Sequence, residues 1–315
     1  MQPTWNTDNL PDDPKLLDRY ITDMEGGIAN LRPGTRAKIV WTDPLNKKIT
    51  DTSLVYLHGF TASHDEGYPV HKAVAARYGM NLYLSRLARH GLEDPDAFRG
   101  LTAEQMIESA RFAIAVGQKI GRKVILMGTS TGGSLSIYLS ARQRPGDLEA
   151  LVLYSPLVKL RGIRSLLLGN AVGRTLLRTI LGRGFTVRTQ SRHPEHSRIW
   201  YIRYRLDGPL ALGKLIEQTM TGDTFRKINL PVFIGYYRKN WREQDRIVSV
   251  SAIQQMSRLL STPAGDRCMV NFPEAGTHVI CSGLLSNAVD RVKNETFSFF
   301  ENVLGHKPLE KNTHF

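Results

Sequence analysis

The chain has 315 residues, of which 41% are apolar, 8% aromatic and 23% charged. This composition excludes wholesale disorder, and the ordinary share of Gly and Pro excludes collagen-like and low-complexity chains. The net charge is +13, which is the one unusual bulk feature. A basic chain attracts anions, nucleic acid or acidic membrane surfaces. The position of the basic residues along the chain is needed to choose among these partners.

The cysteines and the apolar runs give a first expectation of location. Two cysteines, Cys268 and Cys281, are too few for a disulfide framework, so both are predicted to be free and to pack as small apolar side chains. No apolar run approaches the roughly 18 residues that a membrane-spanning helix needs. The N-terminal residues lack the basic start and apolar stretch of a secretory signal. We therefore expect a cytoplasmic protein.

In chain order, short β-rich runs alternate with helical stretches, which is typical of a mostly parallel sheet flanked by helices. Strands are predicted at 37–42, 53–58, 80–84, 123–127, 148–154, 231–235 and 268–272. Helices are predicted at 68–78, 102–120, 131–144, 249–260 and 284–303. Gly79 is a stop signal for the first helix, and Thr102 begins a capping box at the second. The sequence thus predicts an α/β fold.

The alternation breaks between residues 156 and 223, where apolar stretches containing Arg replace it. We interpret residues 156–223 as a helical lid inserted into a core made of residues 1–155 and 224–315. Between Ala150 and Pro194 there are eight basic residues and no acidic one, so this segment carries +8 of the net charge. The eight are Lys159, Arg161, Arg164, Arg174, Arg178, Arg183, Arg188 and Arg192.

Two interpretations of this basic segment are open. An amphipathic helix with Arg on one face and Leu or Ile on the other can lie on an anionic membrane surface. The same pattern suits a lid that packs Leu onto an acyl pocket and leaves Arg in water, and we favour this one because amphipathic surface helices are usual in globular proteins. No nucleic-acid partner is predicted, since no recognised motif accompanies the charge and aromatic residues are sparse among the arginines.

The sharpest chemical signal is the pentapeptide Gly128-Thr129-Ser130-Thr131-Gly132. It directly follows a predicted buried strand and opens a predicted helix, which is the setting of the nucleophile elbow, a strained turn that needs small flanking residues. In that setting the hydroxyl of Ser130 is held at the carboxyl edge of the sheet. A phosphate-cradling loop competes less well, because no Gly-Lys-Ser/Thr sequence follows.

A serine hydroxyl needs a base to take its proton, and in this setting the acid and then the histidine follow the serine along the chain. His278 is predicted to be that base, because it lies in a loop between the last strand and the last helix. His306 and His314 are less suitable, since they lie in a polar tail beyond that helix.

The acid must orient the imidazole and stabilise its charged form. Asp245 is the predicted acid, because it follows the strand at 231–235 and precedes a helix, so its loop opens over the edge of the sheet. Glu243 is the alternative, and Asp223 is less suitable because it precedes that strand.

An oxyanion needs two backbone N–H donors, one of them from the residue after the nucleophile, which is Thr131. The second donor is predicted to be Phe60, after His58-Gly59 at the end of a buried strand. His58 itself is interpreted as structural. Residues His64–Gly67 are interpreted as a solvated polar loop, with substrate contact as the alternative.

These motifs, with Leu57-His58-Gly59-Phe60-Thr61-Ala62-Ser63 and Gly276-Thr277-His278, resemble the α/β-hydrolase family, in particular its carboxylesterase and monoacylglycerol-lipase-like members. The resemblance covers residues 37–303 apart from the lid. It implies a Ser130–Asp245–His278 triad, no metal and no organic cofactor. Epoxide hydrolases and haloalkane dehalogenases of the family carry Asp as the nucleophile, so Ser130 favours acyl transfer.

We therefore expect a serine hydrolase that cleaves small-molecule or lipid carboxylic esters. Haloperoxidase-like and serine aminopeptidase-like members share the triad, so the family alone does not fix the substrate. The alternative is a non-catalytic or peptidase-like scaffold whose basic lid binds an anionic membrane surface or a polyanion. A complete nucleophile, acid and base favour the enzyme, because a pure binding protein has no need of them. No oligomeric state is predicted.

Overall fold

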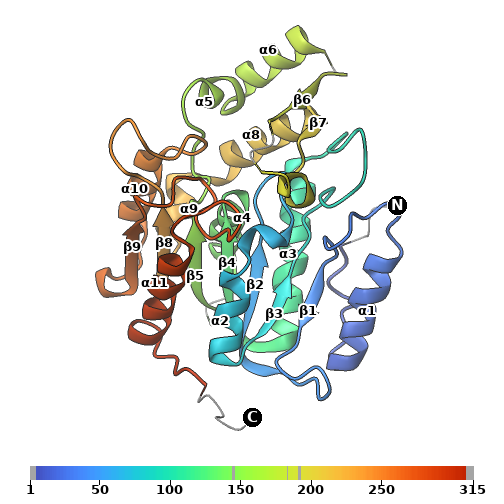
Figure 1. Ribbon diagram of the computed structural model, residues 1–315, viewed down its shortest axis with the longest axis vertical. Helices are drawn as coiled ribbons and strands as arrows, with labels where there is room; N and C mark the ends of the chain where they lie inside the picture. Colours follow the sequence, from blue (N-terminus) through green and yellow to red (C-terminus); the bar gives the residue numbers. More distant parts are fainter. Residues whose placement is uncertain (1–4, 144–145, 183, 191–192, 310–315) are drawn as a thin grey trace.

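The computed structural model describes residues 5–143, 146–182, 184–190 and 193–309. Its centre is a seven-stranded sheet in the order β1-β3-β2-β4-β5-β8-β9 (Figure 1). Strand β1 runs antiparallel to β3, and the other neighbours pair in parallel. The strands are β1 (Lys38–Val40), β2 (Thr50–Leu57), β3 (Asn81–Leu84), β4 (Gly121–Thr129), β5 (Leu148–Tyr154), β8 (Val232–Tyr236) and β9 (Arg267–Asn271). All seven predicted strands are confirmed, and with them the α/β fold.

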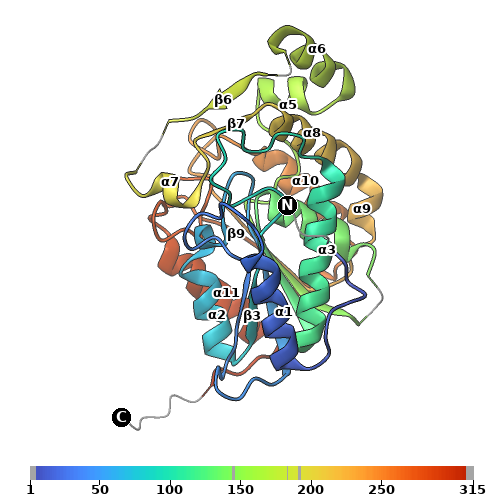
Figure 2. The same ribbon diagram turned by 90° about the vertical axis from the view of Figure 1, so that its right-hand side faces the viewer.

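Alternation along the strands divides the interior into two cores, because successive strand residues point to opposite faces of a sheet. In β2, Val55 and Leu57 join one core, and Leu54 and Tyr56 join the other. The first face is covered by α1 (Pro14–Gly26), α3 (Ala103–Ile120), α4 (Thr131–Ser140), α8 (Asp207–Thr219), α9 (Gly222–Arg226) and α10 (Val250–Leu259). The second is covered by α2 (Val70–Tyr78) and α11 (Val289–Asn302), which lie together in Figure 2.

Capping residues lie at the ends of two predicted helices. Thr102 caps α3 in a complete capping box, and Gly79 ends α2 in the left-handed conformation, with φ 62°. Helix α11 begins at Val289, later than predicted, because residues 282–288 form turns in which serine side chains accept backbone N–H groups. Residue 144, where one predicted helix ends, lies outside the described residues, as do Arg183, Arg192 and His314.

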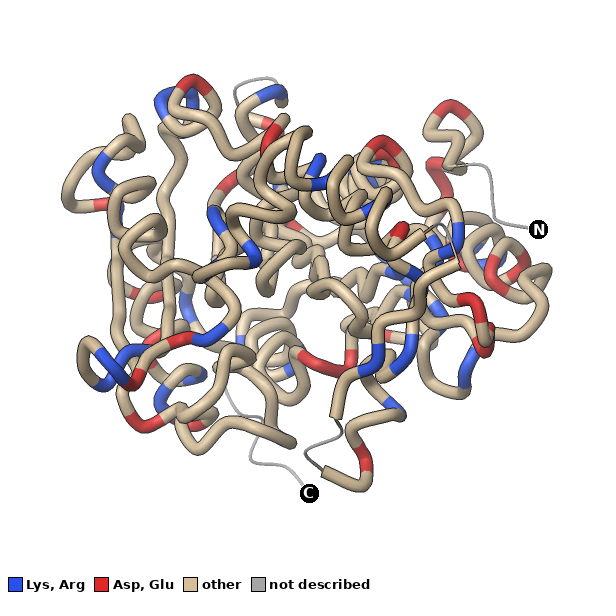
Figure 3. Tube along the Cα trace, turned by 90° about the horizontal axis from the view of Figure 1, so that it is seen from above, with Lys and Arg blue, Asp and Glu red and all other residues tan. Residues whose placement is uncertain are grey.

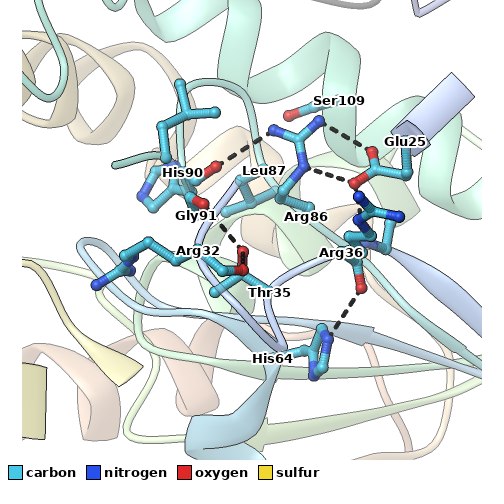
Figure 4. A network of polar contacts seen from close by, with 12 residues as sticks. Glu25, Arg32, Thr35, Arg36, His64, Arg86, Leu87, His90, Gly91 and Ser109 are labelled. Atoms are coloured by element: carbon cyan, nitrogen blue, oxygen red, sulfur yellow. Dashed lines mark hydrogen bonds and ion pairs between the residues drawn. The ribbon is translucent and has the colours of Figure 1, made fainter. Parts of the chain in front are cut away.

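Helix α1 has no counterpart among the predicted elements. Asp13 caps it and Pro14 opens it, which are ordinary start signals. Its place on the sheet depends on a residue distant in sequence, because Glu25 forms a fully buried, two-pronged ion pair with Arg86 at 2.8 and 2.9 Å. Figure 4 shows the guanidinium of Arg86 pointing at this carboxylate, with a further hydrogen bond to the carbonyl of His90 at 3.2 Å.

Residues 156–223, here called the cap segment, follow β5 and lie beyond one end of the sheet (Figure 1). They contain α5 (Ile163–Leu168), α6 (Ala171–Leu181), β6 (Thr186–Arg188), α7 (His196–Ile199), β7 (Arg203–Arg205), α8 and the start of α9. The segment is mostly helical, and strands β6 and β7 add a separate antiparallel ribbon that the sequence analysis does not predict.

The apolar side chains of α5 and α6 are largely exposed. The exposed ones are Ile163, Leu166, Val172, Leu176 and Ile180. Gly173 is the one buried residue of α6, all of which the structure describes. Leu168 packs against the first core, and Leu167, Leu177 and Leu181 are half-buried. The interpretation of this part of the segment as a lid over an acyl pocket stays a prediction.

The cysteines and the helix lengths bear on two predictions made from the composition. Both cysteines are free, as predicted, although Cys268 is only half buried whereas Cys281 is buried. In the described part of the chain, every helix is too short or too polar to cross a membrane.

Candidate active site

Ser130 lies at the sharp turn between β4 and α4. Its backbone has φ 54° and ψ −113°, a conformation that residues other than glycine rarely adopt. The turn is held because the Ser130 N–H donates to the carbonyl of Tyr154 at 2.9 Å and its carbonyl accepts the N–H of Leu157 at 3.0 Å. A side chain at Gly132 would overlap the carbonyl of Leu57 at the end of β2, so glycine lets α4 begin this close to the sheet. This is the strained strand–turn–helix geometry that the pentapeptide predicts.

Loops after β8 and β9 bring Asp245 and His278 together. Nδ1 of His278 lies 2.6 Å from Oδ2 of Asp245. The other oxygen of this fully buried carboxylate accepts the N–H groups of Ile247 and Val248 at 2.8 and 3.0 Å. Among the described residues, Nε2 of His278 has no hydrogen-bond partner. One nitrogen of the ring is therefore fixed, and the other is available to a further group.

Both the histidine loop and the loop after β2 adjoin the Ser130 turn. Oγ1 of Thr129 lies 3.3 Å from Sγ of Cys281, which ties the residue before Ser130 to the loop of His278. A Cβ atom built at Gly59 would lie 3.3 Å from Cβ of Ser130. The candidate residues thus gather where β2, β4, β8 and β9 end.

The two predicted oxyanion donors lie on either side of this turn. Thr131 is the first residue of α4, where a backbone N–H has no partner within the helix and the positive end of the helix dipole lies. Phe60 follows Gly59 in the loop after β2, and its ring stacks on Phe98 with centroids 4.8 Å apart. Stacking fixes the side chain of Phe60, and with it the backbone that carries the N–H.

The charges favour an ionised acid and a basic imidazole. Burial alone would raise the pKa of Asp245, but the charge and hydrogen bond of His278 and two backbone N–H groups lower it below its ordinary value. Burial alone would lower the pKa of His278, but Asp245, with a smaller contribution from Glu66, raises it above its ordinary value. A histidine in this state is a stronger base toward a nearby hydroxyl.

His58 uses both ring nitrogens on the backbone, as the structural interpretation requires. Nδ1 lies 2.9 Å from the carbonyl oxygen of Gly59, and Nε2 accepts the N–H of Leu87 at 3.0 Å. Burial holds the pKa of His58 well below its ordinary value, so the ring is neutral. His58 therefore ties the loop after β2 to the loop after β3.

Residues His64–Gly67 are not a solvated loop, and that interpretation is wrong. They form a 3-10 helix, η1, in which His64 and Glu66 are each 1% exposed. Their burial comes from residues distant in sequence: Trp200 of the cap segment donates Nε1 to Glu66 at 3.3 Å, and the carbonyl of Arg36 accepts from His64 at 3.1 Å. A single Glu within a polar stretch of sequence does not indicate that its side chain is buried, so the burial of Glu66 could not be predicted.

The alternative acids lie elsewhere. Glu243 is exposed and pairs with Lys239 at 3.1 Å, and Asp223 is exposed and pairs with Arg226 at 3.0 Å. Asp245 is therefore the carboxylate that contacts the histidine. Within the described residues, no three His, Cys, Asp or Glu side chains are grouped as metal ligands would be.

Solved structures with a similar architecture include several lipases. One comes from work on LipS and LipT, two metagenome-derived lipolytic enzymes, with 13% identity, a TM-score of 0.69 and coverage of 86% of this chain and 99% of that chain. A monoacylglycerol lipase from Paleococcus ferrophilus has 15% identity, a TM-score of 0.59 and coverage of 86% and 98%. A monoglyceride lipase from Saccharomyces cerevisiae has 13% identity, a TM-score of 0.60 and coverage of 90% and 96%.

At these identities the likeness shows a shared fold. No curated protein matches the chain in sequence. The model of the Alpha/beta hydrolase family matches residues 54–294, which include the Ser130 turn, Asp245 and His278. This match covers most of the chain, and the chain belongs to the alpha/beta hydrolase family.

Proposed function

We propose that this protein is a serine hydrolase that cleaves carboxylic esters, with Ser130 as nucleophile, His278 as general base and Asp245 as the acid that orients it. One observation carries the proposal. The His278 ring is bonded at Nδ1 to a buried carboxylate and has no partner at Nε2, and its loop is tied through Cys281 to Thr129, which precedes Ser130 on the strained turn. This is the arrangement that activates a serine hydroxyl.

In the proposed reaction, Oγ of Ser130 attacks the acyl carbon while Nε2 of His278 takes the hydroxyl proton. Asp245 stabilises the imidazolium, and the N–H groups of Phe60 and Thr131 hold the oxyanion of the tetrahedral intermediate. The bond to the alcohol oxygen then breaks, and His278 gives its proton to the leaving oxygen. Water, deprotonated by the same imidazole, then attacks the acyl carbon. The bond to Oγ of Ser130 breaks, His278 returns its proton to Oγ, and the carboxylic acid is released.

The proposed substrates are small-molecule or lipid esters. The structural neighbours described as lipolytic enzymes and monoglyceride lipases support this class. A peptidase would use the same groups on an amide, so a panel of p-nitrophenyl esters from C2 to C16, compared with a p-nitroanilide, separates the two reactions and defines the acyl length.

The kinetic test is hydrolysis by the variants S130A and H278A. Each is expected to lower kcat by at least about 10⁴-fold, because loss of either group removes the activated nucleophile. S140A is the matched control, since Ser140 lies on the same helix and its hydroxyl donates to the carbonyl of Ile137. Hydrolysis that survives in S130A at the wild-type rate would contradict the proposal.

The exposed face of α5 and α6 favours a second, accessory role, which is contact with an anionic membrane surface. Five large apolar side chains are exposed there, and Arg164 and Arg178 are exposed among them. Figure 3 views the molecule from above and shows the distribution of basic and acidic residues over this end. An apolar face flanked by Arg is suited to the boundary between anionic headgroups and acyl chains, where lipid esters lie.

A further inference from the structure

The loop after β2 contains a buried carboxylate that the proposed reaction does not use. Glu66 is 1% exposed, and both of its oxygens accept hydrogen bonds. Oε1 accepts the backbone N–H of Gly59 and, at 3.4 Å, the hydroxyl of Tyr56. Oε2 accepts Nε1 of Trp200 at 3.3 Å. A buried carboxylate is unfavourable unless hydrogen bonds satisfy it, and here three donors do so.

Gly59 lies between Glu66 and the nucleophile. A Cβ atom built at Gly59 would lie 3.2 Å from Oε1 of Glu66 and 3.3 Å from Cβ of Ser130. The next N–H along the chain belongs to Phe60, the proposed oxyanion donor. Because Glu66 holds the N–H of Gly59, it sets the orientation of the backbone from which Phe60 donates.

Polar contacts connect Glu66 with the serine turn and the histidine loop. The hydroxyl of Tyr56 lies 2.9 Å from Oγ1 of Thr129, which precedes the nucleophile. Oγ1 of Thr129 lies 3.3 Å from Sγ of Cys281. The thiol of Cys281 in turn donates to the backbone carbonyl of Glu66 at 3.9 Å. The contacts form a closed ring through three segments that carry the proposed catalytic groups.

The cap segment joins the same network through Trp200. Its indole binds the carboxylate, and the backbone on both sides of it pairs with the loop after β2. The N–H of Ser63 donates to the carbonyl of Ile199 at 2.9 Å. The N–H of Tyr201 donates to the carbonyl of Thr61 at 2.8 Å. The position of this part of the cap segment is therefore linked to the position of the oxyanion loop.

We propose that Glu66 is the positioning residue of the oxyanion hole, whose ionised carboxylate fixes the Gly59 N–H and the Trp200 indole and thereby holds the Phe60 N–H in place for the transition state. This inference rests on the proposed function and adds the requirement that Glu66 be ionised. The two N–H donors need an acceptor at each oxygen, which a carboxylate offers and an amide does not. The negative charge also favours the imidazolium of His278 that forms together with the oxyanion.

Glu66 adds an ionisation to the pH dependence of the activity. Burial raises its pKa to about 7, although the bonds from Gly59 and Trp200 and the charge of His278 oppose this. Tyr56 and Cys281 face the carboxylate, and burial raises the pKa of both, so they stay protonated near neutral pH. His71, which packs edge-on against Tyr56, has its pKa lowered by burial to about 3 and stays neutral. Activity should therefore rise as the pH increases through about 7, where Glu66 ionises.

The test compares E66Q with D65N in the full-length protein. Asp65 is the neighbouring carboxylate of η1 and pairs with His64 and Arg198 at 3.2 and 3.3 Å, so D65N removes a charge from the same turn without contact to Gly59. On p-nitrophenyl butyrate, E66Q is expected to lower kcat by about 10- to 100-fold, with less than about a twofold change in KM. The loss is partial because the Phe60 N–H is misplaced and not removed. His278 gives every variant an acid limb, so the limb of log kcat against pH is expected to be steeper in wild type and D65N, where Glu66 also ionises near 7, than in E66Q.

A role in folding alone would lower Tm and leave the shape of that profile unchanged, so thermal unfolding is measured on the same samples. E66Q with the wild-type kcat and the wild-type profile would overturn the inference and leave the proposed function standing. E66Q that loses activity while its acid limb stays as steep as that of wild type would also overturn the inference, since a group other than Glu66 would then supply the second ionisation.

A second readout is independent of ester hydrolysis. In ¹H–¹⁵N spectra of the wild type, the amide of Gly59 is expected to lie downfield and to titrate with an apparent pKa of about 7, and this titration should vanish in E66Q. A Gly59 amide that does not titrate would contradict the inference. A titrating amide in a protein without esterase activity would support the contact and contradict the proposed function.

Discussion

At the scale of single residues, Asp245 is expected to control both the tautomer and the pKa of His278. The substitution D245N replaces one acceptor by an NH₂ group, which favours the wrong tautomer and removes the charge that stabilises the imidazolium. We expect kcat to fall by about 10³- to 10⁴-fold. The exposed variant E243Q is the matched control and should stay within about twofold of wild type.

D245N should also change the pH dependence of kcat/KM. In the wild type, kcat/KM is expected to fall as the pH decreases through the pKa of His278, because a protonated imidazole cannot accept the serine proton. Since Asp245 is the main cause that raises this pKa, the acid limb of D245N should move to lower pH. If E243Q alone lowered kcat and shifted the limb, the assignment of the acid would be wrong.

At the scale of elements, the buried pair of Glu25 and Arg86 holds helix α1 on the sheet. E25Q removes one charge and leaves the guanidinium buried without its partner, which is expected to lower the free energy of unfolding by about 3–5 kcal/mol. D290N breaks the exposed ion pair between Asp290 and Lys293 and should change the free energy of unfolding by less than about 1 kcal/mol. Urea unfolding measures both, and an E25Q variant as stable as D290N would show that the pair does not hold the helix.

Element by element, the parts that the sequence predicts are those specified by neighbours along the chain. The Ser130 turn, the capping box at Thr102 and the strand pattern depend on short-range geometry, and each is present in the structure. The β6–β7 ribbon and the burial of Glu66 depend instead on partners up to 134 residues away, and periodicity does not report such contacts. Helix α1 differs, because its start signals at Asp13 and Pro14 are local and only its place on the sheet depends on a distant residue, Arg86.

At the scale of the whole molecule, the uneven charge and the exposed face of α5 and α6 predict binding to anionic lipid. The protein should co-sediment with vesicles of phosphatidylcholine and phosphatidylglycerol and much less with phosphatidylcholine alone, and salt should weaken the binding. I180D should weaken it by roughly tenfold, because it places a charge in the apolar face. L45D is the matched control, since Leu45 is 96% exposed in the loop before β2, away from the cap segment. Binding that is indifferent to lipid charge would contradict this role.

A fluorophosphonate reacts covalently with a serine hydroxyl that is activated as a nucleophile, as proposed for Ser130 and His278. Peptide mass spectrometry after incubation with such a probe identifies the residue that reacts. One covalent adduct is expected, on the peptide that contains Ser130, and it should be lost in H278A. An unlabelled wild-type protein, or an adduct on another residue with Ser130 unmodified, would contradict the proposal.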